Sequence, residues 1–198
     1  TALRLPPLAT PAAPVVTPTG MYGFASKGPW AVYDTTAVHA NSKGFEGAVF
    51  DGRYVYLVPS YNGAGYAGQV TRYDTTGSFT AVGSWAVYDT TAVHANSKGF
   101  IGAVFDGRYV YFVPSYNGAD YAGQVTRYDT TGAFTAVGSW AVYDTTAVHA
   151  NSKGFAGAVF DGRYVYLVPN NNGTVFGQVT RYDTTGSFTA VGSWAVYD

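Results

Sequence analysis

The sequence predicts an all-β fold of stacked, repeated antiparallel sheets. Three observations predict it: a 55-residue repeat, Asp-Gly and Asn-Gly turns between β-rich runs, and a composition with 25 glycines and 18 tyrosines. Residues 30–84 return at 85–139, a third copy at 140–193 is one residue shorter, and a partial copy begins at 194 and ends at 198. The first two copies differ only by Glu46 to Ile101, Leu57 to Phe112, Gly65 to Asp120 and Ser78 to Ala133. A unit of this length buries its apolar face only by stacking on its own copies.

The second copy shows how the first half of the repeat forms a hairpin. Residues 102–105 lead into Asp106-Gly107, and RYVYFVP at 108–114 follows. Asp-Gly between two β-rich runs predicts a type I′ turn, in which both central residues have positive φ. Alternate residues of 108–114 are bulky on both sides, so we expect this strand to be buried between two sheets.

The second half of the repeat supplies two further strands. Pro114 ends the second strand, and the Gly-rich loop 115–123 leads to a third strand at 124–129. SWAVYD at 139–144 is the expected fourth strand, although AFTAV at 133–137 could pair instead. The crossover TTAVHANSKGF then leads to the next copy. Four strands per repeat in a meander are typical of one β-propeller blade.

The order GAVFDGRYVYLVP, a Gly loop and VTRYDTTGSF resembles the kelch repeat. In that resemblance Tyr73 and Asp74 take the places of the kelch Tyr-Asp pair, and Phe79 takes the place of its tryptophan. The paired kelch glycines are replaced by Val58-Pro59, and the unit is longer than the roughly 50 residues of a kelch repeat. The near-identical copies are also similar to recently amplified bacterial propellers and to symmetric designed propellers. The resemblance implies a propeller over residues 21–198 and implies no particular activity.

Composition narrows the classes of function. A formal net charge of −1, with charged residues at 12%, leaves no basic field for nucleic acid and no polybasic membrane anchor. No apolar run is long enough to suggest a membrane span. The chain has no cysteine for a disulfide, a thiolate nucleophile or the cofactor of the copper-radical oxidases built on kelch propellers. Glu46 is the single glutamate, and no P-loop, nucleotide or nucleophile-elbow motif occurs. We therefore expect no enzyme, no catalytic residues and no cofactor.

The N-terminal region differs from the repeats. Residues 1–20 hold five of the nine prolines and predict an extended arm or linker, which could also dock on a neighbouring chain. The start at Thr1, without a signal-peptide pattern, suggests a processed or secreted chain, and the compartment stays open. The predicted domains are therefore the arm at 1–20 and the tandem blades at 21–198.

The count of strands predicts self-association. Closed propellers have about four to eight blades, so three blades cannot close a ring alone. An open stack would expose apolar faces and strand edges. We expect the chain to partner itself, and favour a trimer of nine blades over a dimer of six. The surplus copy of WAVYD, which occurs four times, could complete a neighbour's blade. The alternative is that the chain is one segment of a longer array.

The crossover holds the candidate ligand-binding residues. They are His39, Asn41 and Lys43, His94, Asn96 and Lys98, and His149, Asn151 and Lys153. Each blade supplies one imidazole, and a zinc ion needs ligands at about 2.0–2.1 Å, so the histidines are expected to fix the crossover and no metal site is predicted. The lysines are most simply solvated charges.

Other repeated side chains have structural explanations. Tryptophans 30, 85, 140 and 194 are expected to pack between blades rather than to stack on sugars. Asp34, Asp74 and their repeats should bond turn backbone, and Arg72 and its repeats should pair with such aspartates. The preferred hypothesis is a non-catalytic protein that assembles itself into a ring. The alternative is a multivalent carbohydrate-binding propeller with one weak site per blade.

Overall fold

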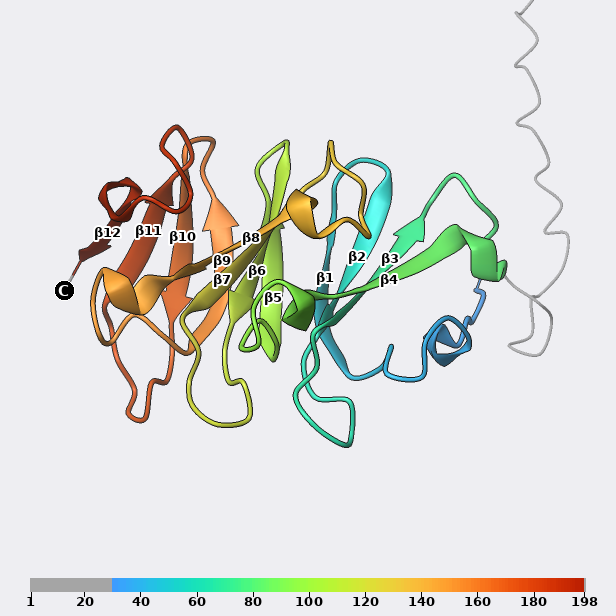
Figure 1. Cartoon of the computed structure of the whole chain (residues 1–198), viewed down its shortest axis with the longest axis horizontal. Helices are drawn as coiled ribbons and strands as arrows, with labels where there is room; N and C mark the ends of the chain where they lie inside the picture. Colours follow the sequence, from blue (N-terminus) through green and yellow to red (C-terminus); the bar gives the residue numbers. More distant parts are fainter. Residues whose placement is uncertain (1–29, 198) are drawn as a thin grey trace, which may run out of the picture. The chain divides into compact units, whose positions relative to one another are not determined.

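The computed structural model of the chain describes residues 30–197, which form twelve β-strands and six short 3-10 helices (Figure 1). The strands make three four-stranded antiparallel sheets, one for each repeat of about 55 residues, which confirms the predicted all-β, propeller-like architecture. Within the described residues, 32–197 belong to one compact unit. The predicted proline-rich arm at 1–20 lies outside the described residues.

Each blade is a meander whose strands lie in chain order, from β1 to β4, β5 to β8 and β9 to β12. Blade 1 consists of β1 (Phe45–Phe50), β2 (Tyr54–Pro59), β3 (Gln69–Asp74) and β4 (Trp85–Asp89). Blade 2 consists of β5 (Phe100–Phe105), β6 (Tyr109–Pro114), β7 (Gln124–Asp129) and β8 (Trp140–Asp144). Blade 3 consists of β9 (Phe155–Phe160), β10 (Tyr164–Pro169), β11 (Val179–Asp183) and β12 (Trp194–Tyr197). The 3-10 helices are η1 (Thr35–Ala37), η2 (Val82–Ser84), η3 (Thr90–Ala92), η4 (Val137–Ser139), η5 (Thr145–Ala147) and η6 (Val191–Ser193).

The blades stand side by side and touch along their first strands (Figure 1). The first strand β5 contacts both β1 and β9, so the first strands are innermost and β4, β8 and β12 are the outer edges. The expected fourth strand WAVYD is confirmed, and AFTAV does not pair, because Val137 begins a 3-10 turn before Trp140. No helix in the described part of the chain is long and apolar enough to span a membrane.

The predicted hairpin joins β5 to β6, but its turn is not type I′. Gly107 has φ of +103°, whereas no residue other than glycine has positive φ within 30–197. Asp106 instead keeps an ordinary backbone and uses its side chain: Oδ1 accepts hydrogen bonds from the N–H groups of Arg108 (2.8 Å) and Tyr109 (2.6 Å). The prediction failed because an aspartate can hold a longer loop through such local bonds.

The second strand of the middle blade is buried on both faces, as predicted. Val110 and Phe112 are both 0% exposed and pack against blade 1. Tyr111 and Val113 are equally buried and pack against blade 3. Two apolar clusters therefore hold the three blades together, one at each blade-to-blade contact.

The tryptophans of blades 2 and 3 lie in these clusters, which confirms that they pack between blades. Trp140 is 6% exposed, and the ring of Tyr88 from the preceding blade stacks on it with centroids 4.6 Å apart. Its Nε1–H donates to the carbonyl of Phe134 (2.8 Å), so its one polar group is satisfied inside the cluster. Tyr143 stacks on Trp194 in the same way at the second contact.

Residues that precede blade 1 repeat this packing without a blade of their own. Tyr33 belongs to the first copy of WAVYD, and its ring stacks on Trp85 with centroids 4.8 Å apart and planes 10° apart. This is the place that Tyr88 occupies on Trp140. Tyr33 therefore lies where the outer strand of a preceding blade would lie.

Candidate functional site

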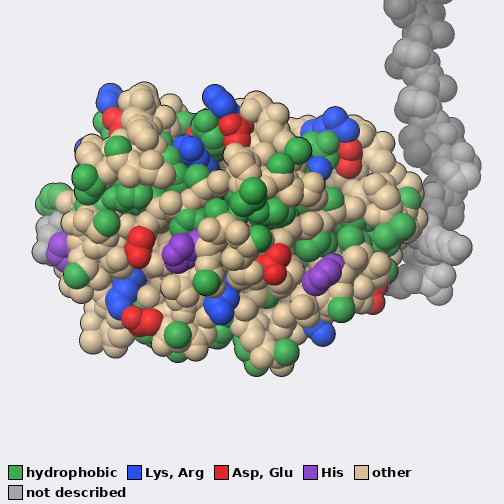
Figure 2. Space-filling model, in the orientation of Figure 1, with side chains coloured by type: hydrophobic (Ala, Val, Ile, Leu, Met, Phe, Trp, Pro, Cys, Tyr) green, Lys and Arg blue, Asp and Glu red, His purple; other side chains and the backbone are tan. Residues whose placement is uncertain are grey.

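The nine predicted site residues lie in the three crossovers, at equivalent places of each. In each crossover the histidine Nδ1 accepts a hydrogen bond from the backbone N–H two residues later, as between His94 and Asn96 (3.2 Å). The histidine side chains form separate patches along the molecule (Figure 2). No group of three or more His, Asp or Glu side chains able to hold a metal ion occurs within residues 30–197. The histidine contacts fit the expected structural role in the crossover.

The crossover between blades 1 and 2 is held against the loops of both blades. The N–H of Gly99 donates to the carbonyl of Ala67 in the blade 1 loop (3.0 Å), and its carbonyl accepts from Ser115 in the blade 2 loop (3.1 Å). Because Gly99 is fixed on both sides, the preceding Lys98 is placed at the junction of the two loops.

The three crossover lysines have different surroundings although their sequences are the same. Lys153 Nζ lies 2.8 Å from Asp120 Oδ2 of the preceding blade, and its side chain is 22% exposed. Lys98 has Gly65 at the place equivalent to Asp120, and it makes no ion pair with any residue of the described chain. Lys43 is exposed.

Asp120 is fixed at its place by two groups. The ammonium of Lys153 and, secondarily, the backbone N–H of Tyr121 hold the pKa of its carboxyl below the usual value. The N–H of Tyr121 lies 2.8 Å from Asp120 Oδ1. Asp120 is therefore a carboxylate that the chain itself supplies to the crossover lysine of blade 3.

Tyrosines line the same edge of the blades as a connected row. The ring centroids are 5.4 Å apart between Tyr61 and Tyr66, 5.1 Å between Tyr66 and Tyr116, and 5.4 Å between Tyr116 and Tyr121. Tyr61 is 51% exposed, whereas Tyr116 is half-buried. Sequence reasoning did not identify Tyr66 and Tyr121, although each follows the one loop position that differs between the first two copies.

Two hollows open between the loops at this edge. The first, about 480 Å³, is lined by Tyr61, Gly65, Tyr66, Asn96, Lys98, Asn117, Gly118 and Ala119. The second has a similar volume and contains the Asp120–Lys153 pair, and Asn96 and Asn117 line both. We call the first hollow the loop cleft. Of the nine predicted residues, the loop cleft brings Asn96 and Lys98 together and leaves His94 out.

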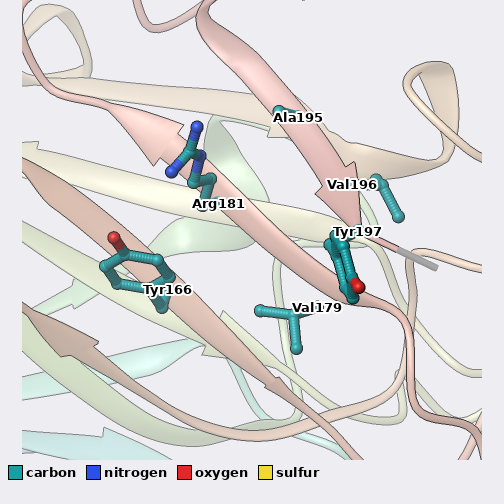
Figure 3. Close-up of a pocket in the computed structure, with 6 residues that line it drawn as sticks. All are labelled: Tyr166, Val179, Arg181, Ala195, Val196 and Tyr197. Atoms are coloured by element: carbon teal, nitrogen blue, oxygen red, sulfur yellow. The ribbon is translucent and has the colours of Figure 1, made fainter.

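A different hollow, of about 340 Å³, lies on the open face of blade 3 (Figure 3). It is lined by Tyr166, Val179, Arg181, Ala195, Val196 and Tyr197. At the two blade contacts the equivalent place is filled by the next blade. There Arg72 lies over the ring of Phe134 (4.3 Å from guanidinium carbon to centroid) and Arg127 over the ring of Phe188 at the same distance.

These arginines do not pair with the turn aspartates, so that expectation was wrong. The pairs are instead made by Arg53, Arg108 and Arg163 with Asp74, Asp129 and Asp183, at 2.6–2.7 Å. Arg72 lies on β3 between aromatic rings of two blades, where its planar guanidinium stacks on Tyr54 (4.0 Å) as well as Phe134. The aspartates do bond turn backbone as predicted, for example Asp129 with the N–H of Thr131 (3.0 Å).

Acid should weaken the fold through these pairs. The bond from Arg108 lowers the pKa of Asp129 to about 2 in the folded chain, from 3.8 as the ordinary value. Because the folded pKa is the lower one, the stabilisation is complete above about pH 4 and is lost as pH falls to about 2. We expect the urea midpoint of the native chain to fall over this range. The urea midpoint of the Arg108→Gln variant should fall less over the same pH range. An equal fall of the midpoint in the two proteins would contradict this explanation.

Comparison with known proteins adds no relative. The chain matches no protein-family model and none of the curated proteins compared with it.

Proposed function

We propose that the chain is a non-catalytic structural protein whose biochemical act is head-to-tail association into a closed propeller ring. One observation carries the proposal: the two end faces of the three-blade stack bear the same residues that are buried against each other inside it. The front face of blade 3 and the back face of blade 1 are therefore expected to dock as blades 1 and 2 do.

The front face of blade 3 consists of Tyr166, Val168, Val179 and Tyr197. Their equivalents in blade 1, which are Tyr56, Val58, Val70 and Tyr88, are at most 8% exposed because blade 2 covers them. No blade of the described residues covers this face of blade 3, and Val168 is 46% and Tyr197 78% exposed. Apolar area of this kind is stabilised by burial at about 25 cal/mol per Å².

The back face of blade 1 shows the complementary difference. It consists of Phe45, Val55, Leu57, Tyr73, Phe79 and Trp85, all half-buried. Their equivalents in blade 2, which are Phe100, Val110, Phe112, Tyr128, Phe134 and Trp140, are at most 6% exposed. Because the face offered by one chain differs from the face that receives it, the contact is heterologous and must close as a ring or continue as a filament.

Arg181 shows what is absent from the open face. It lies over the ring of Tyr164 (4.4 Å), as Arg72 lies over Tyr54. Arg72 also contacts Phe134 of the next blade, and Arg181 has no such second ring within the described chain. In the proposed contact, Phe79 of a second copy takes that place and fills the hollow of Figure 3.

Each chain supplies three blades, so the number of blades in the ring is a multiple of three. Two chains make six blades and three chains make nine. We favour the trimer, because a long repeat with broad aromatic strands suits the larger ring. The kelch-like character of the repeat belongs to the same proposal. It is supported by Phe134, which occupies the expected tryptophan place and packs against Tyr56 of the preceding blade (centroids 6.1 Å apart).

The surplus copy of WAVYD takes part in closure. Tyr33 covers Trp85, the place that Tyr197 of a second chain needs. Either β12 displaces residues 30–34, or residues 30–34 pair with β11 of the second chain and complete its blade 3. Both routes leave one outer strand per blade, and we propose the second, because residues 30–34 continue directly into the crossover of blade 1.

The test is the solution mass, measured by light scattering and native mass spectrometry. We expect a trimer near 63 kDa, three times the 21.0 kDa of the chain. Val168→Asp should give monomers with an unchanged circular dichroism spectrum, because Val168 is already 46% exposed in a single chain.

Val191→Asp is the matched control for this substitution. Val191 is 57% exposed, and its equivalents Val82 and Val137 are 58% and 59% exposed, so this position never lies between blades. Its mass should be that of the native chain. A native chain that is monomeric at micromolar concentration, or a Val168→Asp variant that still assembles, would overturn the proposal.

A further inference from the structure

The two loop hollows differ in whether the crossover lysine has a carboxylate partner. In the second hollow, Asp120 of blade 2 binds Lys153 at 2.8 Å. In the loop cleft, the equivalent residues are Gly65 and Lys98, so the same lysine is present and the carboxylate is missing. Because the two crossovers are identical and the loops before them differ only at this position, Asp120 shows where a carboxylate lies when it binds this lysine. A carboxylate and an ammonium at this distance form a charge-assisted hydrogen bond, one of the stronger polar contacts.

The rest of the loop cleft suits a small ring-shaped ligand. The rings of Tyr61 and Tyr66 provide apolar walls, and their centroids lie 5.4 Å apart. Asn96 and Asn117 also line the loop cleft, and their side-chain amides can bond hydroxyl groups. Asn117 Oδ1 already accepts from the N–H groups of Ala119 (2.9 Å) and Asp120 (3.0 Å), which fixes its amide in place. A volume of about 480 Å³ lies within the range of small-molecule sites.

We propose that the loop cleft binds an acidic sugar, with the sugar carboxylate on Lys98 and the sugar ring between the tyrosines and the two asparagines. Within residues 30–197 the site occurs once. Asp120 fills the equivalent place on blade 2, and the loop of blade 3 is shorter and has no tyrosine. The carbohydrate-binding hypothesis predicted one weak site per blade, whereas the present proposal places one site in each chain.

The site does not depend on ring closure, because both of its walls come from one chain. A monomer should bind one sugar, and a trimer should bind three. The proposals of sugar binding and of ring assembly are therefore tested independently. Loss of assembly in the Val168→Asp variant should leave the number of sugars bound per chain unchanged.

The repeat itself supplies the test variants. Gly65→Asp introduces the residue of blade 2 into blade 1, where an added Cβ meets nothing within 4 Å. This carboxylate should occupy Lys98 and abolish binding. Asp120→Gly introduces the residue of blade 1 into blade 2 and should free Lys153, which raises the stoichiometry from one to two. Lys98→Ala should weaken binding by about tenfold or more, and Lys43→Ala should leave it unchanged.

The probes are galacturonic acid, galactose and acetate, titrated calorimetrically into the full chain, with the melting temperature of each variant measured beside the titration. We expect galacturonic acid to bind more tightly than either other probe, because only it carries both the ring and the carboxylate. Equal binding of galactose would overturn the role of Lys98, and equal binding of acetate would overturn the sugar site. Unchanged binding by a folded Gly65→Asp variant, or no binding of galacturonic acid to the native chain, would overturn the proposal.

Discussion

Val110→Asp is expected to prevent the three blades from packing, whereas Val55→Asp should be tolerated by a single chain. The two valines occupy the same position of the repeat. Val110 is 0% exposed inside the cluster between blades 1 and 2, and Val55 lies half-buried on the back face of blade 1. The pair therefore compares one substitution inside a blade contact with the same substitution at an open end.

The expected loss of stability is large because two free-energy costs add. Removing a buried valine costs about 1.5–3 kcal/mol, and burying an unpaired carboxylate costs several kcal/mol more. Domains are stable by about 5–15 kcal/mol in total, so the change removes much of what is available. Chemical denaturation and circular dichroism should show a Val110→Asp chain that is unfolded or strongly destabilised.

The same pair of variants reports on the ring. If chains close head to tail, Val55 is buried in the assembly, and Val55→Asp should abolish the trimer while the monomer remains folded. A Val110→Asp chain that melts like the native protein would refute two-sided burial of β6. A Val55→Asp chain that still forms trimers would show that the back face of blade 1 is not the docking face.

Gly99→Ala is expected to destabilise the chain far more than Gly107→Ala. Both glycines have positive φ, +70° and +103°, where a side chain costs about 1–2 kcal/mol. A Cβ on Gly107 would meet nothing within 4 Å, but a Cβ on Gly99 would lie 1.9 Å from the carbonyl oxygen of Tyr116. The crossover must therefore move, and its bonds to Ala67 and Ser115 are worth about 1 kcal/mol each.

Urea denaturation of the two glycine variants gives the comparison. We expect a loss of about 3 kcal/mol or more for Gly99→Ala and about 1–2 kcal/mol for Gly107→Ala. The first variant should also lose the loop cleft, since Lys98 moves with Gly99. Equal losses would show that the loop carrying Tyr116 yields to the added methyl group.

The repeat and its alternation were enough to predict the blades. WAVYD as the fourth strand, and the two apolar faces of 108–114, follow from patterns within a few residues. Pairings across blades were not predictable in this way. Asp120 meets Lys153 over 33 residues, and Arg72 lies between rings of two blades instead of beside an aspartate. Such contacts depend on how one blade is placed on the next, which the sequence of a single repeat does not contain.

The prediction of a type I′ turn at Asp106-Gly107 failed for a local reason. Asp-Gly is compatible with a tight type I′ turn and also with a longer loop closed by the aspartate side chain, and the dipeptide alone does not distinguish them. The loop cleft was missed for a related reason. Sequence reasoning identified the lysine of each crossover. It did not show that Lys98 lacks a carboxylate partner, which follows from Gly65, a residue without a side chain, at the position of Asp120.

In the proposed ring, Tyr33 keeps its place on Trp85, and residues 30–34 replace β12 of the neighbouring chain beside β11, so that assembly is a replacement rather than a simple docking. The resident and the incoming tyrosine belong to the same five-residue sequence, so exchanging them changes little free energy at that position. The net free energy of association must therefore come from the other residues of the two docking faces, on blade 3 of one chain and blade 1 of the next. Because the resident strand is tied to the chain, it returns at high effective concentration whenever a neighbour leaves. In this proposal β12 of a lone chain is a reversible competitor of the incoming strand, and it keeps the edge of β11 paired until a partner face arrives.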